Sequence, residues 1–168
     1  MVGNVGRFVY PKNHGFLLRV FQQTAALRQD AWLLLVGDGE RMEQVRAQAE
    51  EMGLGDRVCF TGARLDAAML YSAMDVFCLP SFYEGVPVVA VEAQANGLPC
   101  VLSDRVTAEV LLSPNSLRLP LGDAGQWAKT LSGLRRRQGA LPQADRFDAA
   151  VQAQKLERFY QKACNCPQ

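Results

Sequence analysis

The fold is decided most clearly by residues 75–103, which read DVFCLPSFYEGVPVVAVEAQANGLPCVLS. Short apolar runs at 75–80 and 99–103 flank a longer segment in which Pro87 stands near the start. Strands that are covered on both faces are almost continuously apolar, and proline is favoured at the first position of a helix. The stretch therefore predicts a strand, a helix and a second strand in succession.

The same alternation extends along the rest of the chain. Strand-like apolar runs occur at 4–9, 31–37, 57–62 and 116–121, with helical stretches between them and a last helix over about 145–163. Repeated β-α units imply right-handed crossovers and a parallel sheet with helices on both faces. We therefore predict an α/β fold, a Rossmann-like doubly wound parallel sheet of about six strands.

The composition is that of an ordinary globular protein of one domain's length. The chain has 168 residues, of which 49% are hydrophobic and 21% charged, and its net charge is +1. The basic residues are scattered apart from RRR at 135–137, which we expect to be the solvated end of a helix. This pattern indicates no nucleic-acid partner.

The sequence also suggests a compartment. No apolar run approaches the roughly 20 residues of a membrane span, and we recognise no signal peptide. Cys59, Cys78 and Cys100 alternate into apolar runs and are expected to be reduced core residues, while the C-x-C tail is too sparse for a metal site. These features favour a cytoplasmic location.

The turn over 80–88 is a candidate binding site, because ligands of doubly wound sheets bind beyond the carboxyl ends of the strands. Gly85 has no side chain to block a ligand. The free amides around Gly85, Val86 and Val88 would form a helix amino terminus that attracts phosphate. The alternative is a plain strand-to-helix turn.

Two carboxylates in this apolar stretch sharpen the hypothesis. Glu84 is expected in the loop and Glu92 within a largely buried helix, where a carboxylate needs hydrogen-bond donors. A diphosphate on the helix would repel both groups, so they should face neutral donors: ribose hydroxyls for Glu92 and a hexose for Glu84. Alternatively, Glu92 pairs with a buried arginine or lysine and Glu84 is solvated.

The turn after the first strand supplies cations. Arg7 and Lys12 both suit phosphate oxygens, although each alone could be a simple surface charge. His14, the only histidine, is expected to cap or pack rather than catalyse. The sequence contains no Asp-x-Asp pair and no P-loop motif, so it indicates neither a carboxylate-bound metal nor a P-loop nucleotidase.

Taken together, these motifs resemble the C-terminal half of a GT-B glycosyltransferase of family 4, in its capsule and lipopolysaccharide biosynthesis branch. The resemblance covers about residues 5–163 and is carried by GR and KN at 6–7 and 12–13, VGDG at 36–39, VCFTG at 58–62, LPSFYEG at 79–85 and GLPC at 97–100. Such enzymes are retaining transferases that use UDP- or GDP-sugars, and the resemblance implies no cofactor and no metal.

The resemblance also assigns roles to individual residues. It implies that Arg7 and Lys12 hold the pyrophosphate, that Glu92 binds ribose and that Glu84 lies against the donor sugar. Glu84, Arg7 and Lys12 would thus form the catalytic set. The remaining donor contacts would come from Gly85, Val86, Pro87 and Val88 beside sugar and phosphate, and from Gly62, Ala63 and Arg64 beside the base.

The resemblance further predicts a donor-binding domain over 1–140 and a C-terminal helix and tail over 141–168. That helix would cross toward an N-terminal acceptor-binding domain that this chain lacks. We expect the chain alone to bind nucleotide sugar weakly and to transfer nothing, and only a full-length enzyme to associate peripherally with the inner membrane. Two alternatives remain open: half of a GT-B-type nucleotide-sugar 2-epimerase, against which the single histidine argues, and a non-catalytic nucleotide-binding domain.

Overall fold

The computed structural model of the chain describes residues 1–136 and 148–164. Strands and helices alternate along the chain, as the sequence predicts. The elements are β1 (Val2–Val5), η1 (Tyr10–Lys12), α1 (His14–Leu27), β2 (Leu33–Val36), α2 (Met42–Glu51), η2 (Gly55–Arg57), β3 (Val58–Phe60), α3 (Ala67–Ser72), β4 (Val76–Leu79), α4 (Val88–Ala95), β5 (Cys100–Ser103), η3 (Ala108–Val110), β6 (Leu117–Leu119), α5 (Ala124–Gly133) and α6 (Ala149–Cys164).

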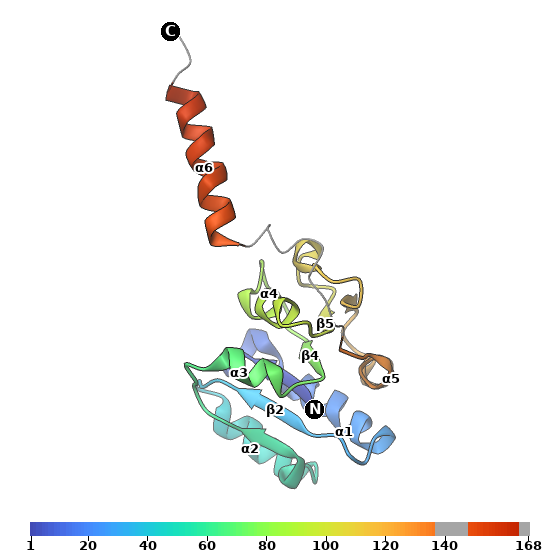
Figure 1. Cartoon of the computed structure of the whole chain (residues 1–168). Helices are drawn as coiled ribbons and strands as arrows, with labels where there is room; N and C mark the ends of the chain where they lie inside the picture. Colours follow the sequence, from blue (N-terminus) through green and yellow to red (C-terminus); the bar gives the residue numbers. More distant parts are fainter. Residues whose placement is uncertain (137–147, 165–168) are drawn as a thin grey trace.

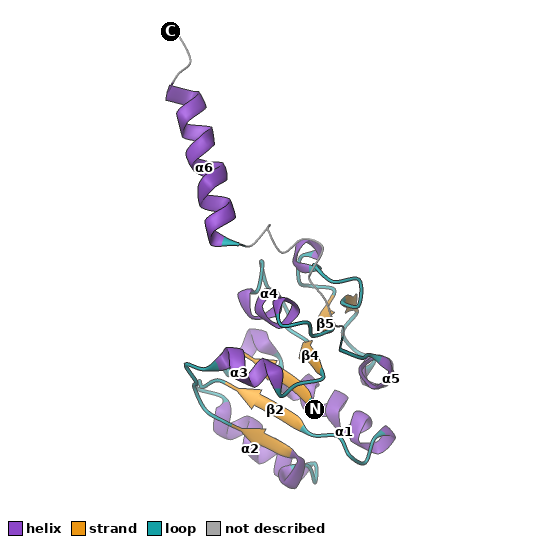
Figure 2. Cartoon of the chain, in the orientation of Figure 1, coloured by secondary structure: helices purple, strands orange, loops and turns teal. Residues whose placement is uncertain are grey.

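The strands form one parallel six-stranded sheet in the order β3-β2-β1-β4-β5-β6. Figure 2 shows the strands as a central layer with helices around it. The strand order reverses between β1 and β4, which are neighbours although residues 6–75 separate them in the chain. The predicted Rossmann-like doubly wound fold is therefore confirmed, and the loops that follow β1 and β4 meet at its topological switch point.

Successive strand residues serve opposite layers of the core. Leu33 and Leu35 of β2 pack with α1, α2 and α5, whereas Leu34 and Val36 pack with α3 and α4. Side chains of a strand point alternately to the two faces, so a strand that is covered on both faces has to be apolar throughout. This is why the continuously apolar runs in the sequence became the strands.

The first strand is shorter than the sequence predicts. It was expected over 4–9, but it ends at Val5, and Phe8 turns back into the core, where its ring stacks on His14 with 4.2 Å between centroids. The backbone N–H of Phe8 donates to the carbonyl of Asp38 at 2.9 Å, beside the end of β2. Arg7 therefore lies in a loop beyond the strand and not on its last residue.

Helix α4 differs from the prediction in its burial and in its first residue. It was predicted to be largely buried, but its buried residues are Ala90, Ala93 and Gln94, while Val88 is 66% exposed and Glu92 is exposed. The small alanines face the sheet, and the apolar residues on the other side reach the surface. The helix also begins one residue later than predicted, because Pro87 has extended backbone and serves as the N-cap.

The predicted burial of Cys59 is also wrong. Cys78 and Cys100 are buried and free, as expected, but Cys59 is exposed. It belongs to β3, which is one of the two outer strands of the sheet. An edge strand is covered less completely than a central one, so an apolar run does not guarantee burial there.

The arginines after α5 are not simply solvated. Arg135 donates to the carbonyls of Ser132 and Leu134 at 2.9 and 2.8 Å, as a cation near a helix carboxyl terminus does. Arg136 reaches across to other helices and donates to the carbonyls of Ser72 at 3.2 Å and Asn96 at 2.6 Å. Arg136 is exposed, as predicted, but it also binds the carboxyl ends of α3 and α4, and position 137 lies outside the described residues.

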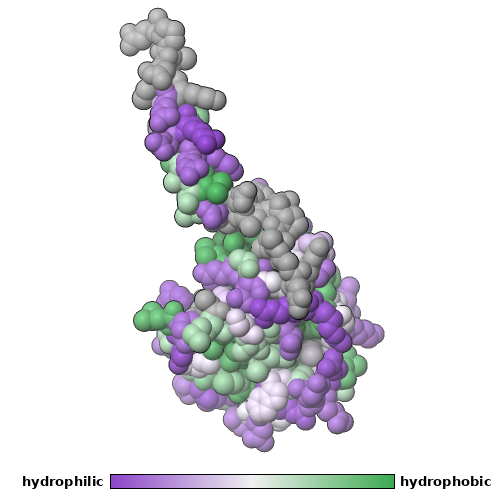
Figure 3. Space-filling view, in the orientation of Figure 1, coloured by the Kyte–Doolittle hydropathy of each residue, from purple (hydrophilic) through white to green (hydrophobic). Residues whose placement is uncertain are grey.

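Helix α6 stands clear of the sheet and its covering helices (Figure 1). Its apolar side chains Leu156, Phe159 and Tyr160 are 55%, 65% and 59% exposed, and Figure 3 shows apolar and hydrophilic residues adjacent along it. The predicted domain boundary at 140/141 lies outside the described residues. Within the described part of the chain, no helix is long and apolar enough to span a bilayer.

Candidate functional site

The loops after β1 and β4 are bound to each other at the switch point. The backbone N–H of Phe82 donates to the carbonyl of Pro11 at 2.8 Å. The side-chain amide of Asn13 donates to the carbonyl of Pro80 at 3.1 Å. These bonds bring Lys12 of the first loop against Glu84 of the second.

Lys12 and Glu84 form an ion pair at the centre of this junction. Lys12 Nζ lies 2.5 Å from Glu84 Oε1, and the two side chains are 16% and 17% exposed. The buried Ser81 also donates its hydroxyl to Oε1, at 3.0 Å, and Ser103 Oγ donates to the carbonyl of Ser81 at 2.5 Å. Glu84 is therefore not solvated, in contrast to the alternative considered above, and it is held by Lys12 from the first loop and by Ser81 from its own loop.

Glu92 has a different partner from the one that the alternative suggested. The Tyr71 hydroxyl donates to Glu92 Oε2 at 2.8 Å, and Glu92 forms no salt bridge with any residue in the described ranges. Burial raises the pKa of Tyr71, and the hydrogen bond to Glu92 raises it further. The phenol therefore remains a neutral donor at physiological pH.

A hollow of about 420 Å³ opens at the carboxyl ends of β1, β2 and β3. It is lined by Val5, Gly6, Arg7, Val36, Gly37, Asp38, Gly39, Ala63 and Arg64. Arg64 forms two hydrogen bonds with Asp66, at 2.8 and 2.7 Å. Arg7 is exposed and, among the residues described, its side chain has no ion-pair or hydrogen-bond partner. It is thus a cation at the hollow whose donors are unused.

The predicted site residues fall into adjoining groups. Arg7, Ala63 and Arg64 line the hollow, and the carbonyl of Gly62 accepts from the N–H of Gly37 at 2.9 Å beside it. Lys12 and Glu84 are not part of its lining. A Cβ added at Gly6, which does line the hollow, would lie 3.3 Å from Lys12 Cε, so the Lys12 stem packs against a residue of the hollow.

The amino end of α4 is open. A Cβ atom added at Gly85 would meet no other atom within 4 Å, and Val86 and Val88 are 41% and 66% exposed. The first N–H groups of an α-helix have no acceptor within the helix. Here the helix begins four residues after Glu84, so its amino end, a lysine and a carboxylate share one junction.

His14 packs, as the sequence predicts. Its ring is 4% exposed and stacks on Phe8, and Nε2 has no hydrogen-bond partner within the described residues. Burial, together with the nearby charges of Lys12 and Arg41, lowers the pKa of His14 to about 4. A neutral, enclosed ring supports the first loop.

Sequence reasoning missed Tyr71 and Ser81. A signal existed for each: a buried tyrosine hydroxyl usually needs a partner, and Ser81 stands three residues before Glu84 in the turn. Neither signal names the partner, because Tyr71 and Glu92 come from different helices.

A doubly wound sheet with such a junction at its switch point is found in glycosyltransferases of the GT-B type, among other classes, and comparison with known proteins decides between them. Residues 1–136 match the model of the family described as glycosyl transferases group 1. The chain belongs to this family.

Curated relatives include glycosyltransferases of bacterial surface polysaccharides. The putative glycosyltransferase EpsF of Bacillus subtilis is 38% identical over 137 residues, which are 79% of this chain and 35% of EpsF. The lipopolysaccharide core biosynthesis glycosyltransferase LpsD of Rhizobium meliloti is 30% identical over 163 residues, 97% of this chain and 46% of LpsD. The chain thus spans less than half the length of these relatives.

Solved structures share the fold. Anabaena HepE in complex with UDP-glucose superimposes with a TM-score of 0.69 at 28% identity, over 77% of this chain and 37% of HepE. The pneumococcal O-GlcNAc transferase GtfA, in complex with UDP and GlcNAc, gives a TM-score of 0.76 over 98% of this chain and 36% of GtfA. At 15% identity, the second likeness concerns the fold alone.

Proposed function

We propose that this chain is the nucleotide-sugar-binding part of a retaining glycosyltransferase that adds a sugar to a growing cell-surface polysaccharide or lipopolysaccharide. The observation that carries the proposal is the Lys12–Glu84 pair at the switch point, which lies between the open amino end of α4 and the loop of Arg7. Ligands of doubly wound sheets bind at this point.

The cations suit the pyrophosphate of the donor. Arg7 has its guanidinium donors free within the described residues, and an ammonium has three donors, of which Glu84 occupies one on Lys12. Together with the amides at the start of α4, these groups would neutralise the charge of the departing diphosphate without a metal ion.

The carboxylates suit hydroxyl groups on either side of the pyrophosphate. Glu84 is fixed by Lys12 and Ser81 through Oε1, so Oε2 can accept from the donor sugar. Glu92 would accept from the ribose diol. The hollow lined by Ala63 and Arg64 lies within the size range of small-ligand pockets and would receive the base of UDP or GDP.

The relatives support the class of reaction. EpsF and LpsD are described as glycosyltransferases, and HepE was solved with UDP-glucose. Because the chain spans less than half of its curated relatives, we propose that it binds donor but transfers no sugar until an acceptor-binding part completes the cleft.

Calorimetric titration of the chain with UDP, GDP and their glucose and mannose conjugates tests the proposal. We expect one nucleotide series to bind, with binding reduced at least about tenfold in Lys12→Ala and in Glu92→Ala. Arg28→Ala, a matched loss of charge at the opposite edge of the sheet, should bind as the wild type does. If no nucleotide binds, or if both site variants bind normally, the proposal is wrong and a non-catalytic role is favoured.

A further inference from the structure

A buried tyrosine stands directly behind Glu92. Tyr71 lies at the end of α3 and is 2% exposed, and its ring packs edge-on against Phe77 of β4 with 6.1 Å between centroids. Its hydroxyl reaches Glu92 Oε2 at 2.8 Å. Since packing in the core fixes the ring, the position of the hydroxyl is fixed as well.

The helices that carry these residues are joined a second time at their carboxyl ends. One guanidinium nitrogen of Arg136 donates to the carbonyls of Ser72 and Met74, at 3.2 and 3.3 Å, beyond Tyr71 on α3. The other nitrogen donates to the carbonyl of Asn96 at 2.6 Å, after α4. The distance between α3 and α4 is therefore set independently of the Tyr71–Glu92 bond.

This arrangement has a chemical consequence for Glu92. The residue is exposed, and a glutamate on a helix surface has several rotamers, whose loss opposes binding. A hydrogen bond to Oε2 from a fixed donor selects the rotamer before any ligand arrives. Oε1 then remains available to accept from another group.

We propose that Tyr71 is a positioning residue: it holds Glu92 in one rotamer so that Oε1 accepts from the ribose hydroxyls of the nucleotide. The inference rests on the proposed function, in which Glu92 binds ribose. Tyr71 itself does not touch the ligand. Because burial raises the pKa of Tyr71, the phenol donates this bond at every pH at which the protein would be assayed.

The test compares UDP, or GDP if that series is the one bound, with its 2′,3′-dideoxy form by calorimetry. In Tyr71→Phe, which keeps the buried ring and removes only the hydroxyl, affinity for the nucleotide should fall about fivefold. Affinity for the dideoxy form should not change, because it has no diol for Glu92 to bind. Tyr160→Phe, which removes an exposed hydroxyl on α6, is the matched control and should change neither affinity.

The outcomes separate the two proposals. If Tyr71→Phe loses affinity equally for the nucleotide and for its dideoxy form, or loses affinity for neither, the positioning role is overturned while the proposed function stands. Failure of the wild type to bind any nucleotide overturns the proposed function and, with it, this inference. In a Glu92→Ala background the Tyr71→Phe effect should disappear, and a persisting effect also contradicts the inference. If Tyr71→Phe does not fold, Tyr71→Met, which fills the site with a flexible thioether, is titrated with the same two ligands.

Discussion

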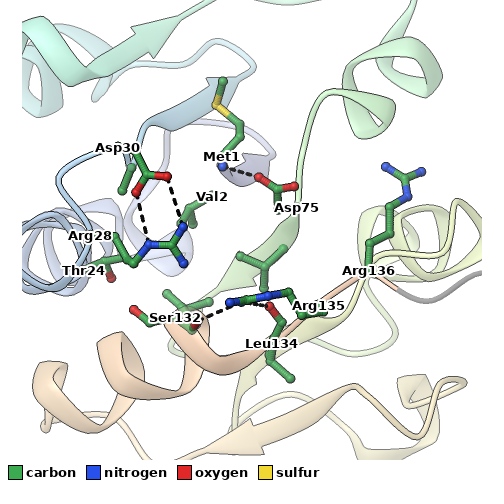
Figure 4. Close-up of a pocket in the computed structure, with 13 residues that line it drawn as sticks. Met1, Val2, Thr24, Arg28, Asp30, Asp75, Ser132, Leu134, Arg135 and Arg136 are labelled. Carbon is green, nitrogen blue, oxygen red and sulfur yellow. Dashed lines mark hydrogen bonds and ion pairs between the residues drawn. The ribbon is translucent and has the colours of Figure 1, made fainter.

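A hollow with arginines in its wall lies at each end of the strands, the amino edge where they begin and the carboxyl edge where they end. The two hollows differ in whether every arginine side chain is already bonded. At the amino edge, a hollow of about 220 Å³ lies beside Val2 and Val76 (Figure 4). Arg28 forms two hydrogen bonds of 3.1 Å with Asp30 there, and Arg135 donates to main-chain carbonyls. At the carboxyl edge, the hollow of about 420 Å³ is lined by Arg64, which pairs with Asp66 in the same way, and by Arg7, whose side chain has no partner within the described residues.

The comparison teaches that neither a hollow nor its arginines identify a binding site. An arginine that already bonds to a carboxylate gains little from a second anion, whereas an unpaired one gains a charge-assisted hydrogen bond. The carboxyl edge combines such a cation with an open helix amino end and a fixed carboxylate. Each of the following experiments substitutes a residue at or near the carboxyl edge, and they are given from the largest expected effect to the smallest.

Gly37→Ala should damage the carboxyl edge most. Gly37 has φ +137°, and an added Cβ would lie 2.1 Å from the carbonyl oxygen of Gly6. We expect the free energy of unfolding in urea to fall by about 3 kcal/mol or more. Gly62→Ala is the control, because its φ is also positive, at +70°, but nothing lies within 4 Å of the added atom. Its loss should be about 1 kcal/mol, and equal losses would contradict the steric explanation.

Acid should weaken the carboxyl edge through His14. Its pKa is lowered from 6.5 to about 4 by burial, so between these pH values the unfolded chain binds a proton that the folded chain does not. Stability should therefore be unaffected by this residue above pH 6.5 and fall by about 3 kcal/mol as the pH decreases to 4.

Urea denaturation across this range, with His14→Phe as the reference, isolates the effect from that of the carboxylates. The variant should lack the part of the pH dependence that arises from His14, while the stack on Phe8 remains. Identical pH profiles for wild type and variant would show that the ring is not held neutral.

Removing one partner of the Lys12–Glu84 pair should be costly because both side chains are mostly buried. Lys12→Met should lower the free energy of unfolding by about 2 kcal/mol, less than for a fully buried pair, since water screens part of the charge. Adding Glu84→Gln should restore most of the loss, and a double-mutant cycle measures the coupling. Arg28→Met, which breaks the exposed pair at the amino edge, should leave the melting temperature unchanged. A similar loss of stability in Lys12→Met and Arg28→Met would contradict the expectation that the pair at the carboxyl edge matters more.

Arg7→Ala should affect ligand binding and not stability. We expect affinity for the bound nucleotide diphosphate to fall about tenfold, the contribution of a charge-assisted hydrogen bond, with an unchanged melting temperature. Arg7→Lys keeps the charge and loses the planar fork, so its affinity should lie between those of the wild type and Arg7→Ala. Calorimetry at two salt concentrations provides the measurement. Normal binding by Arg7→Ala would contradict the view that the unpaired arginine at the carboxyl edge binds the ligand.

Much of the fold could be predicted from local sequence. The run at 31–37 contains β2, because each residue of Leu33–Val36 faces a covered layer, and Asp123 caps α5 by accepting from the N–H of Gln126 at 3.0 Å. Predictions failed where burial depends on distant elements. Cys59 belongs to a strand as predicted, but this strand is the sheet's edge, and Glu92 lies on a helix face that no layer covers.

The sequence by itself determined the alternation of strands and helices, the parallel sheet and the identity of the charged residues near its carboxyl edge. These follow from periodicity and turn chemistry, which act over a few residues. Only the tertiary structure decided that Lys12 pairs with Glu84, 72 positions away, and that Tyr71 holds Glu92 from another helix. The physical reason is that strand order makes β1 and β4 neighbours, and contacts between side chains then depend on distances in space that no spacing along the chain encodes.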